Sequence, residues 1–263
     1  MKSICLSCLL YTLKDKEVKD NMYLDIFYLW LGKLIQSGGL TENDLIQVTM
    51  DQRTCEYLET NETSLPILLE KLPCPFKTIV IEPPSNSLEG MMNKYLITEY
   101  SQDVYIYCDI DILISNSLHV LTEKLSKNTF YFCREGFLSD ENYCGSNSSE
   151  ITDKKLPGFS AGKFIITGKE QRNSFFNTIQ GFCDYSTRFY TVEQPFFNRA
   201  IYSLERHIVS IDVDTLTEHV SFNGNEYSKT NTIFNDMAGN VGDGKSHASK
   251  IMTALSLYLA GVY

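Results

Sequence analysis

Short apolar runs alternate with segments of helical periodicity through the first half of the chain. Near-continuous apolar runs predict buried strands, and apolar residues three or four positions apart predict amphipathic helices. The predicted strands are Ile4–Thr12, Leu45–Met50, Lys77–Ile81 and Val104–Cys108. The predicted helices between them are Tyr23–Ile35, Gln52–Leu58 and Ser85–Thr98, the last with a Ser or Asn cap. This alternation indicates an α/β fold whose mainly parallel central sheet has helices on both faces.

The second half of the chain is less regular. Its predicted strands and helices are Ser117–Leu125, Thr129–Phe132, Lys163–Thr167, Glu170–Phe182 and Glu193–Tyr202, of which the second and third are strands. The polar segment Glu135–Pro157 is predicted to be a long loop, and loops of that length commonly serve a site. A Gly- and Asn-rich loop is expected over Asn223–Lys250, ahead of a closing helix at Ile251–Leu259. With neither a repeat nor a linker visible, the 263 residues are expected to form one domain.

Two Asp-x-Asp motifs follow predicted strands. Asp109 and Asp111 come directly after Val104–Cys108, whereas Asp212–Asp214 follows a later, isolated strand that would lie at an edge. Ligands of parallel sheets bind beyond the carboxyl ends of the strands. Paired carboxylates can hold the divalent cation that neutralises a diphosphate. The strand setting therefore favours Asp109 and Asp111 as a metal site, although the motif alone is common and a solvated turn would also contain it.

Three later segments are ordinary when taken singly. In Pro157–Ile166 two glycines flank a serine before a strand, which is typical of a turn but also lets a ligand approach the backbone. Glu193 and Gln194 lie at a predicted helix start after the capping residue Thr191. The loop Asn235–Lys250 combines three glycines with two lysines, a combination that can surround a phosphate.

Composition and charge narrow the class of protein. A net charge of -10, from 33 acidic and 23 basic residues, argues against a nucleic-acid binder. An anionic nucleotide can still bind if a divalent cation bridges it to the protein. Several of the eight cysteines lie in apolar runs, and Cys5 and Cys8 form a lone CxxC, so a zinc or redox site is the weaker interpretation. No apolar stretch reaches the roughly 20 residues of a membrane span, and a cytoplasmic protein is expected.

In their order and spacing, these segments together resemble retaining glycosyltransferases of the GT-A fold, in particular family 8, which includes glycogenin and bacterial galactosyltransferases. The matching segments are Leu9–Thr12, Tyr105–Asp111, Phe159–Gly162, Glu193–Pro195 and Asp236–Gly239. The resemblance spans most of the chain. It implies a nucleotide-binding half over residues 1–114 and an acceptor half with a metal and phosphate loop over residues 115–263.

The resemblance also implies roles for individual residues. The uracil and ribose of a UDP-sugar would lie near Leu10, Tyr11 and Thr12, and Asp109-Ile110-Asp111 would bind Mn²⁺ or Mg²⁺ and the diphosphate. Lys94 would approach the sugar or the diphosphate. The remaining assignments are Gln194 beside the anomeric carbon with Glu193 next to it, Gly239 in the phosphate loop, and Lys245 or Lys250 against the leaving group.

This sequence departs from the family pattern at two places. Phe159-Ser160-Ala161-Gly162 stands where Asn-Ser-Gly is usual, and Asp236 stands where the family has a metal-binding His. Asp is a suitable ligand for Mn²⁺ or Mg²⁺, so three carboxylates could form the site. Two alternatives stay open: His247 could supply the third ligand from a shifted loop, or the third ligand could be lost.

The expected function is transfer of a hexose from a UDP-sugar to a hydroxyl of a sugar, glycan or protein acceptor, with retention and with a metal. One alternative is a degenerate protein that binds a nucleotide sugar without turnover. A second is a haloacid-dehalogenase-like phosphatase with Asp109 as its nucleophile. That class has its motif near the N-terminus followed by Gly-Thr, whereas here Ile112-Leu113-Ile114 follows.

Overall fold

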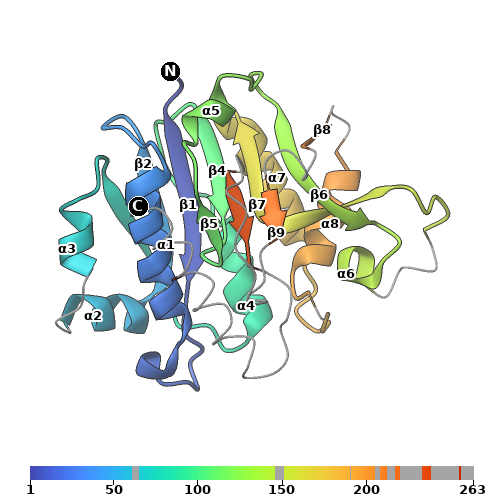
Figure 1. The fold of residues 1–263 in the computed structure, drawn as a ribbon. Helices are drawn as coiled ribbons and strands as arrows, with labels where there is room; N and C mark the ends of the chain where they lie inside the picture. Colours follow the sequence, from blue (N-terminus) through green and yellow to red (C-terminus); the bar gives the residue numbers. More distant parts are fainter. Residues whose placement is uncertain are drawn as a thin grey trace.

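A seven-stranded sheet runs through the centre of the molecule in the order β3-β2-β1-β4-β7-β6-β8 (Figure 1). The structure is a computed structural model that describes residues 1–60, 65–145, 151–189, 191–204, 208–211, 217–219, 233–237 and 255. The strands of this sheet are β1 (Ile4–Leu10), β2 (Leu45–Asp51), β3 (Phe76–Ile81), β4 (Val104–Cys108), β6 (Phe130–Phe137), β7 (Pro157–Thr167) and β8 (Ile208–Ile211).

Most neighbours in this sheet are parallel. The pairs β1–β2, β1–β4, β2–β3 and β6–β8 are parallel, and β7 is antiparallel to both β4 and β6. The four strands predicted in the first half of the chain are all present, so the α/β fold with a mainly parallel sheet is confirmed. The strand over residues 208–211, expected at an edge, lies at the edge next to β6.

The hairpin of β6 and β7 is longer than predicted. Residues 157–162 were expected to turn into a strand, but they already pair with β6 across two register shifts. Gly136 and Gly158 are opposite each other in this pair, and a Cβ on either would lie 2.6 or 2.5 Å from the ring of Tyr143. The predicted loop over residues 135–157 therefore contains the end of β6 and the helix α6 (Glu141–Cys144), which carries that ring.

A second, small sheet of three strands covers part of one face. It contains β5 (Ile112–Ile114), β9 (Thr217–His219) and β10 (Phe234–Asp236), in the order β5-β10-β9. The pattern of the sequence indicated none of these strands, and residues 234–236 were expected in a loop. Strands of three residues are too short for a periodic signal, and β10 depends on pairing with β5, which is far away in sequence.

Most helices agree with the predictions more in position than in length, and the helix over residues 65–69 was not predicted. The helices are α1 (Tyr23–Ser37), α2 (Gln52–Thr60), α3 (Leu65–Leu69), α4 (Ser87–Met92), α5 (His119–Thr122), α7 (Lys169–Phe182) and α8 (Gln194–Tyr202), with 3-10 turns η1 (Val18–Asp20) and η2 (Asn93–Tyr95). Asn86 caps α4 by accepting from the Glu89 amide at 3.0 Å, as expected. The predicted helix over 85–98 ends early, because η2 takes over at Asn93 and Leu96 is extended.

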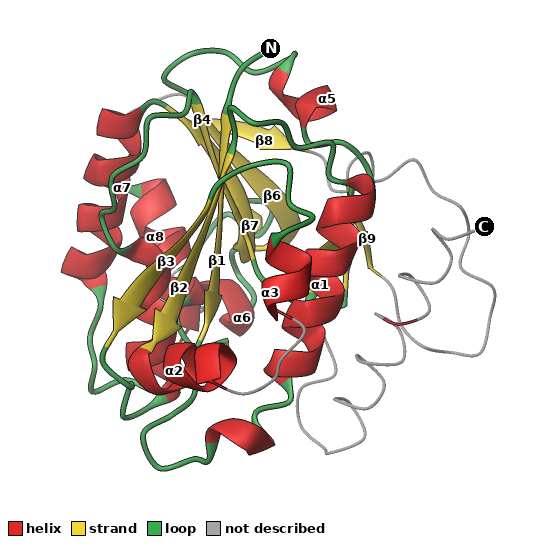
Figure 2. Ribbon diagram, turned by 90° about the vertical axis from the view of Figure 1, so that its left-hand side faces the viewer, coloured by secondary structure: helices red, strands yellow, loops and turns green. Residues whose placement is uncertain are grey.

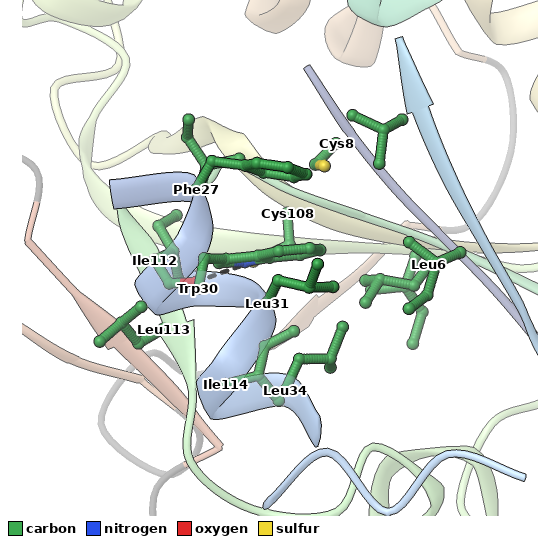
Figure 3. Close-up of a cluster of buried hydrophobic side chains, with 14 of the residues drawn as sticks. Leu6, Cys8, Phe27, Trp30, Leu31, Leu34, Cys108, Ile112, Leu113 and Ile114 are labelled. Atoms are coloured by element: carbon green, nitrogen blue, oxygen red, sulfur yellow. Dashed lines mark hydrogen bonds between the residues drawn. The ribbon is translucent and has the colours of Figure 1, made fainter. Parts of the chain in front are cut away.

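Helices cover both faces of the large sheet (Figure 2). Apolar residues form two clusters, one on each face. On one face α1 and the small sheet pack against the strands, and Figure 3 shows Phe27 and Trp30 of α1 stacked beside Cys8 and Cys108. On the other face α7 and α8 enclose an aromatic cluster that includes Phe164 of β7. In the described part of the chain, no helix is long and apolar enough to cross a membrane.

Candidate active site

A pocket of about 500 Å³ opens at the carboxyl ends of β1 and β4. The predicted nucleotide and metal segments both line it, through Leu10, Tyr11, Thr12, Asp109, Ile110 and Asp111. The rest of the wall comes mainly from residues 13–23 and from α4. This is the place where ligands bind in open parallel sheets, and the volume lies within the range of about 300–1,000 Å³ that small-molecule sites occupy.

Buried polar contacts hold the end of β1 against the pocket. The Thr12 amide donates to Asp51 Oδ2 at 2.8 Å, and the hydroxyls of Thr12 and Thr54 are 2.9 Å apart. Asn21 Nδ2 donates to the Tyr11 carbonyl and to Thr12 Oγ1, both at 2.9 Å. Asp51 was not predicted as a site residue. Its position at the end of β2, like that of Asp109 directly after β4, was the available signal. Together these bonds fix where residues 11 and 12 face the pocket.

The Tyr11 ring lies directly against α4. A Cβ at Gly90 would lie 2.3 Å from a ring carbon of Tyr11, so only glycine lets the ring approach the helix this closely. The phenol oxygen also donates to the Ser87 carbonyl at 3.4 Å. Gly90 was not among the predicted site residues, because a helical glycine gives no sign of what packs against it.

Arg53 of α2 fixes the loop that follows β1. Its guanidinium donates to the carbonyls of Leu13, Lys14 and Lys16, at 3.5, 3.0 and 2.8 Å. Leu13 and Lys16 line the pocket. Arg53 therefore shapes the pocket wall from outside it, and the sequence carried no signal of this role.

Asp109 lies in a network of buried polar groups. Its Oδ1 accepts from the Tyr107 hydroxyl at 2.6 Å, and its Oδ2 is 3.1 Å from Lys94 Nζ. Lys94 Nζ is also 2.6 Å from Glu193 Oε1, and the Lys94 side chain is only 1% exposed. The Asp109 amide donates to the Gly162 carbonyl at 2.8 Å, which ties the motif to β7. The structure thus joins three predicted site residues, Lys94, Asp109 and Glu193, through one ammonium group.

This network shifts the protonation of its members. Burial raises the pKa of Asp109 to about 6, the Lys94 ammonium opposes the rise, and the charges of Asp111 and Glu193 add to it. Burial would lower the pKa of Lys94, but the carboxylates of Asp109 and Glu193 outweigh it and raise that pKa above its ordinary value. Lys94 is therefore a permanent cation between two carboxylates.

Two carboxylates at the pocket have the chemistry to hold a divalent cation. Asp109 keeps 23% of its side chain exposed and lines the pocket together with Asp111. Hard oxygen ligands of this kind suit Mn²⁺ or Mg²⁺, which complete their coordination with water and substrate phosphates. Among the residues that the structure describes, no third His, Cys, Asp or Glu converges with these two.

Asp236 lies near the motif but faces a different partner. It ends β10, where it pairs across the ladder with Ile112, and the Met237 amide donates to the Asp111 carbonyl at 3.0 Å. Its carboxylate binds Lys163 Nζ, which also binds Glu135. Asp236 was predicted as a metal ligand in a loop, and Lys163 and Glu135 were not singled out. The position of Lys163 next to the apolar run of β7 was the available signal that a buried ion pair lies there.

The start of α8 is tied to β7 beside the network. Gln194 Oε1 accepts from the Ala161 amide at 3.1 Å, and its Nε2 donates to the Asn142 carbonyl at 3.0 Å. Asn198 bonds both backbone groups of Phe159, accepting at 2.8 Å and donating at 2.9 Å. Residues 159–162 are therefore hydrogen-bonded to α8, the helix that begins directly after Glu193.

Some predicted site residues lie outside the residues that the structure describes. They are Gly239, Lys245, His247, Lys250 and the second Asp-x-Asp motif.

Comparison with known proteins gives structural relatives only. No protein-family model and no curated protein sequence matches the chain. The galactosyltransferase LgtC, solved with donor and acceptor sugar analogues, matches with a TM-score of 0.61 at 12% identity, over 97% of this chain and 95% of that one. Mouse xyloside xylosyltransferase 1 matches at 0.54 and 13%, over 83% and 88% of the two chains. The bifunctional glycosyltransferase WbbM matches at 0.53 and 9%, over 97% of this chain and 44% of that one.

The chain therefore has a GT-A-like fold. The match to LgtC covers nearly the whole of both chains.

Proposed function

We propose that this protein is a metal-dependent retaining glycosyltransferase that transfers a hexose from a UDP-sugar to an acceptor hydroxyl. One observation carries the proposal: a single pocket is lined by the end of β1 and by Asp109 and Asp111. A nucleotide in this pocket would lie along Leu10–Thr12 with its diphosphate toward the carboxylates. An acidic protein needs a cation to receive a diphosphate there.

The proposed metal site consists of Asp109 and Asp111. A bound Mn²⁺ or Mg²⁺ would neutralise charge on the diphosphate as it leaves. Lys94, which is not among the residues that line the pocket, binds one carboxylate oxygen of Asp109, and the Tyr107 hydroxyl binds the other. Because Lys94 also binds Glu193, the same ammonium links the metal site to the start of α8.

The proposed reacting centre is where α8 begins. Gln194 would lie beside the anomeric carbon, and its amide is oriented by the Ala161 amide and the Asn142 carbonyl. Glu193 is 2% exposed and paired with Lys94, so its proposed role is to position Lys94 and Gln194 rather than to attack the sugar. Gly239, Lys245 and Lys250 are proposed to contact the phosphates.

The acceptor is proposed to be a hydroxyl of a sugar, glycan or protein. A cytoplasmic location is also proposed, because all eight cysteines, each in the described part of the chain, are free thiols. A phosphatase of the haloacid-dehalogenase type gains no support from a glycosyltransferase-like fold. A nucleotide-sugar binder without turnover is the remaining alternative.

Calorimetry with UDP and GDP, each with Mn²⁺ and with EDTA, tests the donor and the metal together. We expect UDP to bind in Mn²⁺ and to lose that affinity in EDTA, with GDP weaker. Equal UDP affinity in both buffers would contradict the metal. If UDP binds with metal but no UDP-sugar in a panel is hydrolysed or transferred, the protein is a binder.

A further inference from the structure

Lys163 is a fully buried cation between two carboxylates. Its side chain is 0% exposed and binds Glu135 of β6 and Asp236 of β10, whose side chains are 14% and 1% exposed. The two carboxylates raise the pKa of Lys163 above its ordinary value against the effect of burial. Lys163 is therefore an ion-pair partner of Asp236 in the interior of the protein.

This cluster lies on the opposite face of the sheet from Lys94. Lys163 pairs with Cys108 across β4 and β7 and shares its face with Ile165, in the cluster that includes α1 and β10. Lys94 stands 5.3 Å from the ring centre of Tyr107, in the aromatic cluster of the other face. The end of β4 is thus flanked by two buried lysines, each with two carboxylates.

The Asp236 carboxylate is engaged by Lys163 and not by the pocket. It does not line the pocket wall, whereas Asp109 and Asp111 do. Backbone bonds keep β10 in place on both sides of it, from the Met237 amide to the Asp111 carbonyl at 3.0 Å and from the Ser115 amide to the Ile233 carbonyl at 2.9 Å. Reaching a cation in the pocket would require Asp236 to leave Lys163 and these bonds to shift.

We infer that Asp236 is a structural residue that holds β10 and is not a metal ligand, because the Lys163 ammonium, and not a metal ion, neutralises its carboxylate. The Lys163–Asp236 pair fixes β10, and β10 in turn fixes the backbone of Asp111 through Met237. This inference rests on the proposed function for the identity of the metal site. It assigns metal binding, among the described carboxylates, to Asp109 and Asp111.

Mn²⁺ titration of Asp236→Asn beside Asp111→Asn tests the inference. An asparagine at 236 keeps an oxygen for Lys163 but loses the charge. We expect Asp236→Asn to bind Mn²⁺ within about threefold of the wild type while its Tm falls by several degrees. The control Asp111→Asn should lose Mn²⁺ affinity about tenfold or more. If Asp236→Asn loses Mn²⁺ as Asp111→Asn does, the inference is wrong.

A double-mutant cycle tests the pair without any metal. Lys163→Gln and Asp236→Asn should each lower the Tm, and the double variant should lose clearly less than the sum of the two shifts. Additive shifts would overturn the pairing. If the wild type binds no Mn²⁺, the proposed metal dependence fails, and this cycle still decides the structural role. If a variant does not fold, a wild-type crystal structure with Mn²⁺ decides instead, because coordination of the ion by Asp236 overturns the inference and an intact pair with Lys163 supports it.

Discussion

At the scale of single residues, Lys94 connects the parts of the site. It bonds Asp109 of the proposed metal site and Glu193 at the start of α8, and it is almost completely buried. Removal of the Lys94 ammonium would leave two carboxylates close together in a poorly solvated place. Breaking this buried ion-pair network would therefore lower the free energy of unfolding. The same contact that stabilises the fold also fixes the orientation of Asp109.

Lys94→Met is therefore expected to lower both stability and donor turnover. Breaking a buried pair costs about 3–5 kcal/mol, which chemical denaturation measures. The matched control is Lys169→Met, because Lys169 pairs with Glu99 on the surface, where the two side chains are 42% and 77% exposed. That exposed pair should contribute little, and equal losses in the two variants would mean that Lys94 has no special role.

Gly90→Ala is expected to weaken nucleotide binding. The new Cβ would lie 2.3 Å from the Tyr11 ring, so the ring has to move in the pocket. A displaced ring changes the wall of the pocket, and the Kd for UDP is expected to rise on the order of tenfold, or about 1.4 kcal/mol. The overpacking itself should lower the free energy of unfolding by about 1–3 kcal/mol.

The control for that prediction is Gly181→Ala in α7. A Cβ there has no atom within 4 Å, and alanine favours a helix over glycine. This variant should bind UDP as the wild type does and be at least as stable. If both alanine variants bind UDP like the wild type, the Tyr11 ring does not touch the nucleotide.

At the scale of elements, the pocket depends on segments that are held from outside it. Asp51 holds the end of β1, Arg53 of α2 holds the loop after it, and Asn198 of α8 holds residue 159 of β7. Asp51 and Arg53 lie where β2 passes into α2, and Asn198 lies in the middle of α8. The pocket therefore depends on how the elements join.

Arg53→Ala is expected to weaken UDP binding without unfolding the protein. It releases three carbonyls of the loop that lines the pocket, and hydrogen bonds from a charged donor contribute about 1.5–3 kcal/mol each when well shielded. Because Arg53 is partly exposed, a loss of about three- to tenfold in affinity is expected. Arg188→Ala is the control, since Arg188 holds carbonyls of its own turn that do not line the pocket. An unchanged Kd in Arg53→Ala would show that the loop needs no such support.

At the scale of the whole molecule, the first half of the fold could be predicted and the second half only in part. The parallel strands are continuous apolar runs, which makes them and the carboxyl ends at Thr12 and Asp109 visible in the sequence. The strands β5 and β10 are three residues long and form by pairing with each other across a long stretch of sequence, so no local pattern could reveal them.

The candidate site could also be predicted only where a local pattern marks its residues. Residues 109–111 and 10–12 follow from strand ends, and they share one pocket. The partner of Asp236 depends on β10 lying over β7, which only the tertiary structure shows. Motif spacing predicted Asp236 near the proposed metal site, but it could not show that the buried Lys163 of β7 pairs with Asp236 there.

Turnover of a UDP-sugar by the wild type and by Asp111→Ala, in Mn²⁺ and in EDTA, tests the central claim most directly. Loss of one carboxylate leaves the proposed cation under-coordinated, so turnover should fall on the order of 100-fold, to the level of the wild type in EDTA, while the fold survives. The metal should not rescue the variant. Wild-type turnover in Asp111→Ala, or turnover in EDTA equal to that in Mn²⁺, would contradict the account of a metal-dependent glycosyltransferase.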